Sequence, residues 1–295
     1  MNRRSKRSAF TVFPLLLAFL AFAGCGAGTD ISEGTEYIKA VEQRDPAETQ
    51  KVITEAEEAF KAALEEEALK AAASDTAAPD GTYTSGTWQN EAEHEAARAA
   101  LYEDLVNQAQ SGIIRELSVD ETAAYQAVFA DTVIIGDSMA QSVYDYGFLD
   151  GAHVFFSRGA IVRDLTEQIA EACAMLPSKV IFFTGLNDTD HETVESYAEA
   201  YASQVAYVRS LLPEAQIFIC SMTPPSDILA AERDDLAQSV YYTAALRDWC
   251  AYGEAIYIDQ DILVRQDLYL EDGIHFEMRY FYLWIQYVAL MCGLI

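Results

Sequence analysis

The second half of the chain alternates short apolar runs with longer amphipathic segments. Five runs of strand length, rich in β-branched and aromatic residues, occupy residues 132–135, 152–156, 179–184, 216–221 and 255–259. Each run is apolar throughout instead of alternating, which is typical of strands buried on both faces of a sheet. The intervening segments 161–176, 190–212 and 228–252, and a closing segment 277–293, repeat apolar residues at helical spacing. This alternation predicts an α/β fold, with a five-stranded parallel sheet between layers of helices.

Helices are also predicted ahead of the first strand. Asn90 with Glu93, and Ser118 with Glu121, have capping-box spacing, and they begin helices over 91–110 and about 119–130. We expect residues 89–130 to be a helical lead-in that packs on the domain formed by 131–295. Residues 26–88 are acidic, with a predicted helix from Pro46 to about residue 73, followed by turn-rich sequence. We interpret 26–88 as a tether, because a solvated helix of this composition acts as a semi-rigid spacer.

The first 25 residues have the pattern of an export signal. A basic start is followed by a nearly unbroken apolar run over 9–24, which is short for a transmembrane span. The run ends in Phe22-Ala23-Gly24-Cys25, which resembles a bacterial lipobox, with Phe22 in place of the usual Leu. We therefore expect an exported protein, lipid-modified at Cys25 and anchored to the outer face of a bacterial membrane. A plain signal peptide or an uncleaved anchor are the alternatives, and both also place the rest of the chain outside the cytoplasm.

Charge and cysteine content narrow the function. The chain has 47 Asp and Glu against 19 Lys and Arg, a net charge of −28, and no basic stretch after its first residues, which argues against nucleic-acid binding. Cys173, Cys220, Cys250 and Cys292 have no zinc-site spacing, so we expect neither a metal nor another cofactor. A Cys250–Cys292 disulfide is left open by the sequence.

Polar residues follow the predicted strands where they would meet at one edge of the sheet. Gly136-Asp137-Ser138 follows the first strand, Ser157-Arg158-Gly159 the second, and Gly185-Leu186-Asn187-Asp188 the third. Asp272-Gly273-Ile274-His275 comes after the fifth strand and a loop. Chemistry in such sheets gathers at the carboxyl ends of the strands, so these groups are expected to converge.

The convergent groups are those that serine acyl transfer requires. We predict Ser138 as nucleophile, His275 as general base, and Asp272 as the carboxylate that orients the imidazole. The N–H groups of Ser138 and Gly159 and the side-chain amide of Asn187 are predicted to bind the oxyanion. Supporting positions are Gly136, Asp137, Gly185 and Asp188.

These four blocks resemble those of the SGNH hydrolases, also called the GDSL esterase/lipase family. Met139 stands where the first block usually has Leu, and Arg158-Gly159 replaces the more common Ser-Gly of the second. The resemblance covers about the last 165 residues. It implies a flavodoxin-like α/β/α sandwich and metal-free ester hydrolysis through an acyl-serine.

Compartment and resemblance together suggest a substrate class. We expect a serine esterase that removes acyl groups, chiefly acetyl, from small-molecule or glycan esters at the cell envelope. Tyr144, Tyr146, Arg158 and the loop 222–226 are candidates to line the acyl pocket. An O-acetyltransferase acting on cell-surface glycan with the same triad, and a non-catalytic envelope lipoprotein, are the alternatives. The acidic domain should repel polyanionic substrates.

Overall fold

The computed structural model describes residues 91–184 and 186–295. The expected signal at 1–25, its Cys25, the tether at 26–88, the Asn90 cap and Gly185 lie outside the described residues. None of the described helices has the length and apolar character needed to cross a membrane.

Five parallel strands form one sheet in the order β2-β1-β3-β4-β5. The strands are β1 Thr132–Gly136, β2 Val154–Phe156, β3 Lys179–Phe183, β4 Gln216–Cys220 and β5 Ile256–Ile258. Each falls on one of the five predicted runs, so the predicted α/β fold with a five-stranded parallel sheet is confirmed. The first strand lies between the second and third, pairing Ile134 with Val154 on one side and with Ile181 on the other. This order places the end of β1 at the reversal point of a doubly wound sheet, where such folds bind ligands.

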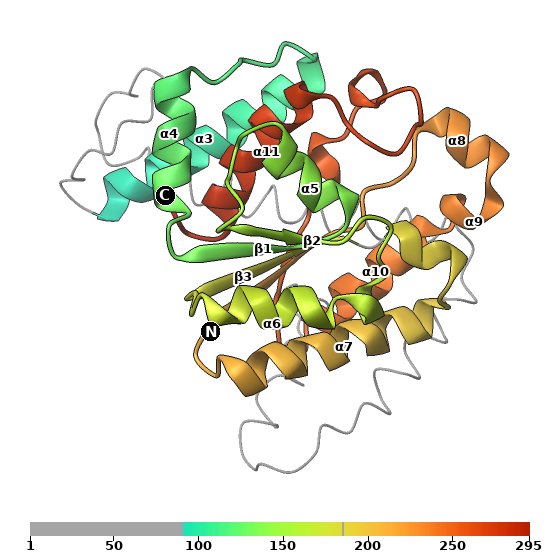
Figure 1. The fold of residues 1–295 in the computed structure, drawn as a ribbon. Coiled ribbons are helices and arrows are strands. Elements are labelled where there is room, and N and C mark those ends of the chain that lie inside the picture. The colour runs from blue at the N-terminus through green and yellow to red at the C-terminus, as the bar shows by residue number, and fades with distance from the viewer. Residues whose placement is uncertain (1–90, 185) are drawn as a thin grey trace, which may run out of the picture.

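Helices cover both faces of the sheet (Figure 1). One face carries α3 (Glu91–Ser111), α4 (Val119–Val128), α5 (Ser138–Asp145) and α11 (Met278–Met291), and the other carries α6 (Thr166–Ala174), α7 (Val194–Leu211) and α10 (Ser239–Cys250). Successive β1 residues point to opposite layers: Ile134 joins the core beneath α11, while Val133 and Ile135 join the core beneath α7. Burial on both faces explains why the strands read as continuous apolar runs.

The closing helix α11 is almost wholly buried. Its aromatic residues form the centre of one core, where Trp284 stacks on Phe183 with ring centroids 4.6 Å apart. Helix α3 lies against α11, and Arg98 donates to the main-chain oxygens of Leu290 and Ile295. The predicted Ser118–Glu121 capping box is present at the start of α4.

The prediction of one continuous helix over 228–252 is wrong. The segment forms three helices: α8 (Asp227–Glu232), α9 (Asp234–Ala237) and α10. Arg233 interrupts them in an extended conformation, and its guanidinium pairs with Asp190 and Asp235. The predicted helix over 161–176 likewise splits into a 3₁₀ turn, η2 (Val162–Asp164), and α6. Three further 3₁₀ turns are η3 (Leu186–Asp190), η4 (Asp261–Leu263) and η5 (Gln266–Leu268).

The four cysteines of the described residues are free and buried. Cys250 belongs to the core beneath α7, and Cys292 to the core beneath α11. The sheet therefore separates the two thiols, and they form no disulfide.

Candidate active site

The nucleophile candidate stands at the tight turn from β1 into α5. Gly136 ends the strand against β3, where a Cβ on it would lie 2.0 Å from the Phe183 carbonyl oxygen, so only glycine fits. Asp137 is the N-cap of α5, and its Oδ1 accepts from the Met139 N–H at 2.8 Å. Ser138 is the first helical residue, and within the described residues its N–H has no acceptor. The hydroxyl and a free N–H are thus presented together at the edge of the sheet.

The base comes from the other end of the domain, just before α11. His275 Nε2 lies 2.7 Å from Ser138 Oγ, although the two residues are 137 positions apart. His275 Nδ1 lies 2.7 Å from Asp272 Oδ2. Because a carboxylate only accepts, the proton is on Nδ1 and Nε2 is open to the Ser138 hydroxyl proton.

A turn built on Gly273 holds the acid and the base together. Gly273 has φ of +69°, and a Cβ there would lie 2.4 Å from Ser226 Oγ, so no other residue fits without displacement. Asp272 Oδ1 accepts from the N–H groups of Ile274 and His275, both at 2.9 Å. Burial alone would raise the pKa of Asp272, but these bonds and the one from the imidazole lower it below 3.8. Asp272 is therefore ionised over the range in which an imidazole acts as base.

A second free N–H is available from the loop after β2. The Ser157 N–H bonds the Gly136 oxygen at 3.0 Å, which continues the ladder and brings this loop beside the turn that bears Ser138. Gly159 has φ of +70°, is exposed, and within the described part of the chain its N–H has no acceptor. These are the properties that the predicted oxyanion role requires of Gly159.

The Asn187 side chain lies beside the turn that bears Ser138, but both hydrogens of its amide already have acceptors. Asn187 Nδ2 donates to Asp137 Oδ2 at 2.9 Å and to the Ala160 oxygen at 3.1 Å. An amide has two N–H bonds, so binding an oxyanion would require Asn187 to share or re-aim one of them. In this structure Asn187 instead ties the cap of α5 to the loop that follows Gly159.

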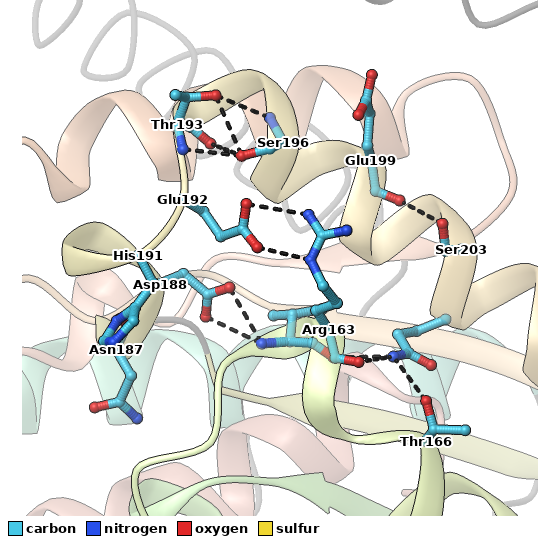
Figure 2. A network of polar contacts seen from close by, with 12 residues as sticks. Arg163, Thr166, Asn187, Asp188, His191, Glu192, Thr193, Ser196, Glu199 and Ser203 are labelled. Carbon is cyan, nitrogen blue, oxygen red and sulfur yellow. Dashed lines mark hydrogen bonds and ion pairs between the residues drawn. The ribbon is translucent and has the colours of Figure 1, made fainter.

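Asp188 supports the same loop through the Val162 N–H. Its carboxyl is fully buried, and both oxygens lie near the Val162 N–H, at 3.1 and 3.2 Å (Figure 2). The pKa of Asp188 is raised to about 8, chiefly by burial, with the neighbouring Asp137 adding to the rise and the Val162 hydrogen bond acting against it. Asp188 is thus a neutral acid at pH 7.

An exposed ion pair lies beside this support. Arg163, on η2, pairs with Glu192 at 2.8 Å (Figure 2). His191, a competing base in sequence terms, has its Nδ1 3.0 Å from the Asn187 main-chain oxygen. His191 therefore contacts the main chain of η3, and it makes no hydrogen bond to the Ser138 hydroxyl.

The candidate pocket residues have separate surroundings. Tyr146 donates to the Phe276 oxygen at 3.1 Å, and Tyr144 packs near Phe156 with ring centroids 6.0 Å apart. Arg158 Nε donates to Gln141 Oε1 at 2.6 Å. Of the loop 222–226, four residues are buried and Pro224 is half-buried, so the loop is largely part of the scaffold.

No group of three or more His, Cys, Asp or Glu side chains within 91–184 and 186–295 is placed to hold a metal ion. The geometry brings together the Ser138 hydroxyl, the His275 imidazole and the Asp272 carboxylate, and the free Ser138 N–H lies on the same turn as the hydroxyl. This set can remove a serine proton, attack a carbonyl carbon and bind the resulting oxyanion.

Comparison with known proteins finds similarity in structure only. No protein-family model matches the chain, and no curated protein is similar to it in sequence. Among solved structures, a GDSL-like lipase from Bacteroides thetaiotaomicron VPI-5482 is 10% identical with a TM-score of 0.45, over 65% of this chain and 98% of that one. A lipase/acylhydrolase from Enterococcus faecalis is 16% identical with a TM-score of 0.41, over 55% of this chain and 96% of its own.

A carbohydrate esterase family 3 protein from Talaromyces cellulolyticus is also 16% identical, with a TM-score of 0.41, over 55% of this chain and 93% of its own. Likenesses at these identities concern the architecture alone, so the function is argued from the site.

Proposed function

We propose that the protein is a serine esterase that hydrolyses acyl esters, chiefly acetyl esters, of small molecules or glycans. One observation carries this proposal: His275 bridges Ser138 Oγ and Asp272 Oδ2 with two contacts of 2.7 Å each. These two contacts connect a nucleophile, a base in the right tautomer and an orienting carboxylate in sequence.

The steps of the reaction follow from the Ser138–His275–Asp272 contacts. His275 Nε2 takes the Ser138 hydroxyl proton as Oγ bonds to the ester carbonyl carbon. The N–H groups of Ser138 and Gly159 bind the oxygen on which negative charge develops. The imidazolium then gives its proton to the alcohol oxygen, the ester bond breaks and an acyl-serine remains. Water, deprotonated by the same imidazole, releases the acid and restores the hydroxyl.

Location at the cell envelope belongs to the same proposal. The basic start, the apolar run and Cys25 support export and lipid anchoring of the chain on the outer face of a bacterial membrane. Radiolabelled palmitate incorporated into the wild type and not into Cys25→Ala is the expected result, and equal labelling of both would contradict it.

Active-site labelling tests the chemistry. A fluorophosphonate probe should label Ser138 in the wild type and nothing in Ser138→Ala. The wild type should hydrolyse 4-nitrophenyl acetate. In Ser138→Ala and in His275→Ala, kcat should fall by a factor on the order of 10⁶, with little change in Tm. Ser142→Ala is the matched control, because its hydroxyl donates to the Ser138 main-chain oxygen one turn along α5. An unlabelled wild type without turnover would refute the proposal and favour a non-catalytic envelope protein.

Adding a glycan acceptor separates hydrolysis from transfer. A hydrolase releases acetate from acetylated xylan or 4-nitrophenyl acetate at a rate that does not depend on the acceptor. An O-acetyltransferase would hydrolyse slowly alone and would produce acetylated glycan when the acceptor is present.

A further inference from the structure

Arg158, in the loop between β2 and Gly159, differs from the other arginines of the described residues. Arg158 is the second residue after β2, and its neighbour Gly159 offers one of the two N–H groups that have no acceptor among the described residues. The side chain is exposed, and its Nε donates to Gln141 Oε1. Gln141 lies three residues after Ser138 on α5, which is about one helical turn or roughly 5 Å along the axis. The residue that holds the Arg158 guanidinium therefore lies about one helical turn from the residue that bears the reacting hydroxyl.

Arg158 forms no ion pair among residues 91–184 and 186–295, and its one side-chain acceptor is a neutral amide. The other arginines of the same residues each meet a carboxylate or main-chain oxygens; they are Arg98, Arg115, Arg163, Arg209, Arg233, Arg247, Arg265 and Arg279. In a chain with a net charge of −28, an arginine without a carboxylate partner among the described residues is unusual, and this one precedes Gly159 in the loop after β2.

The hydrogen bond to Gln141 uses only Nε of Arg158 and leaves the two terminal nitrogens of the guanidinium available. Gln141 is buried, and its Nε2 is fixed by Asp145 Oδ2 at 2.8 Å, so its oxygen is a steady acceptor for Arg158 Nε. Both terminal nitrogens of Arg158, with four N–H bonds, have no acceptor in the described structure. Two parallel N–H bonds from one guanidinium match the two oxygens of a carboxylate.

We propose that Arg158 selects esters that carry a carboxylate close to the scissile bond. The inference rests on the proposed esterase function and names the substrate class of that site. The acidic surface repels polyanions at long range, whereas one carboxylate that reaches the site meets the guanidinium next to the serine. Neutral esters would still react, with no help from this side chain.

Matched ester pairs test the assignment. On the acyl side, 4-nitrophenyl hemisuccinate is compared with 4-nitrophenyl butyrate; on the alcohol side, 3-acetoxybenzoate is compared with phenyl acetate. Arg158→Gln should lose about tenfold in kcat/KM for the carboxylated member of one pair, mainly through KM, because a charged hydrogen bond at an exposed site is lost. The neutral member should change less than about twofold. The pair that responds tells on which side of the ester the carboxylate binds.

Two further variants define the cause. Arg158→Lys keeps the positive charge but not the paired N–H donors of the guanidinium. Its kcat/KM for the carboxylated ester should lie between those of Arg158→Gln and the wild type. Arg163→Gln, which removes the arginine paired with Glu192 on η2, should leave the ratio of anionic to neutral rates unchanged. Added salt should reduce the wild-type preference, because the guanidinium is exposed.

The outcomes separate the inference from the function it rests on. If Arg158→Gln affects both members of each pair equally, or neither, the inference is wrong while the esterase function stands. If the wild type hydrolyses none of the four esters and Ser138 takes no fluorophosphonate, both are wrong.

Discussion

The neutral state of Asp188 makes a measurable prediction about stability. The carboxyl is fully buried, and its pKa is raised from 3.8 to about 8. Between these two values the folded protein holds a proton that the unfolded chain has lost. Stability contributed by this group is therefore complete below about pH 4 and declines as the pH rises toward 8.

The size of the decline follows from the shift. Each pH unit in that window costs about 1.4 kcal/mol of unfolding free energy. From pH 5 to pH 7.5 the wild type should lose about 3 kcal/mol through this residue alone. Asp188→Asn keeps an oxygen for the Val162 N–H and has no proton to lose, so it escapes the decline. The unfolding free energy of Asp188→Asn relative to wild type should thus rise by about 3 kcal/mol between the two pH values.

Urea denaturation at both pH values measures this difference, with the fluorescence of the protein's tryptophans, among them the buried Trp284, as the signal. Asp164→Asn makes the same substitution at an exposed position on η2, and its unfolding free energy relative to wild type should change far less with pH. Asp188→Ala removes the acceptor of Val162 and should be destabilised at both values. An Asp188→Asn difference that is equal at pH 5 and pH 7.5 would mean that Asp188 is ionised throughout, and would refute the reasoning.

Two further substitutions test the turn and the amide. Asn187→Ala should keep part of the rate, with a loss of about 10²–10³ if the amide binds the oxyanion, and wild-type kcat would show that Asn187 acts only by tying Asp137 to the loop. Gly136→Ala should be destabilised by more than about 3 kcal/mol because of the clash with the Phe183 oxygen, against about 1 kcal/mol for Gly147→Ala at an open left-handed position, both measured by urea denaturation.

The sheet was predictable because its physical signal is local. A strand buried on both faces must be apolar at consecutive positions, and β3, for example, reads Lys-Val-Ile-Phe-Phe. The convergence of Ser138 and His275 was predictable for a related reason. Parallel strands place their ends at one edge, so Ser138 and His275 could be assigned to one site from the order of the elements.

The parts that the sequence did not predict depend on tertiary contacts. At the break, the Arg233 guanidinium pairs with carboxylates on two segments, one of them 43 residues away, and helical periodicity does not reveal such a partner. The engagement of both Asn187 hydrogens depends on where Asp137 and Ala160 lie in the folded chain. The raised pKa of Asp188 follows from its complete burial, which the sequence Gly-Leu-Asn-Asp does not reveal.

The hydroxyl and the imidazole arrive from opposite ends of the described domain and meet only across its assembled sheet. No local fragment contains both of them, so a partly unfolded molecule that has released either β1 or the Gly273 turn has no working site. Catalytic rate should therefore report on cooperative folding of the entire sheet. Heat inactivation and loss of tryptophan packing should follow one common curve.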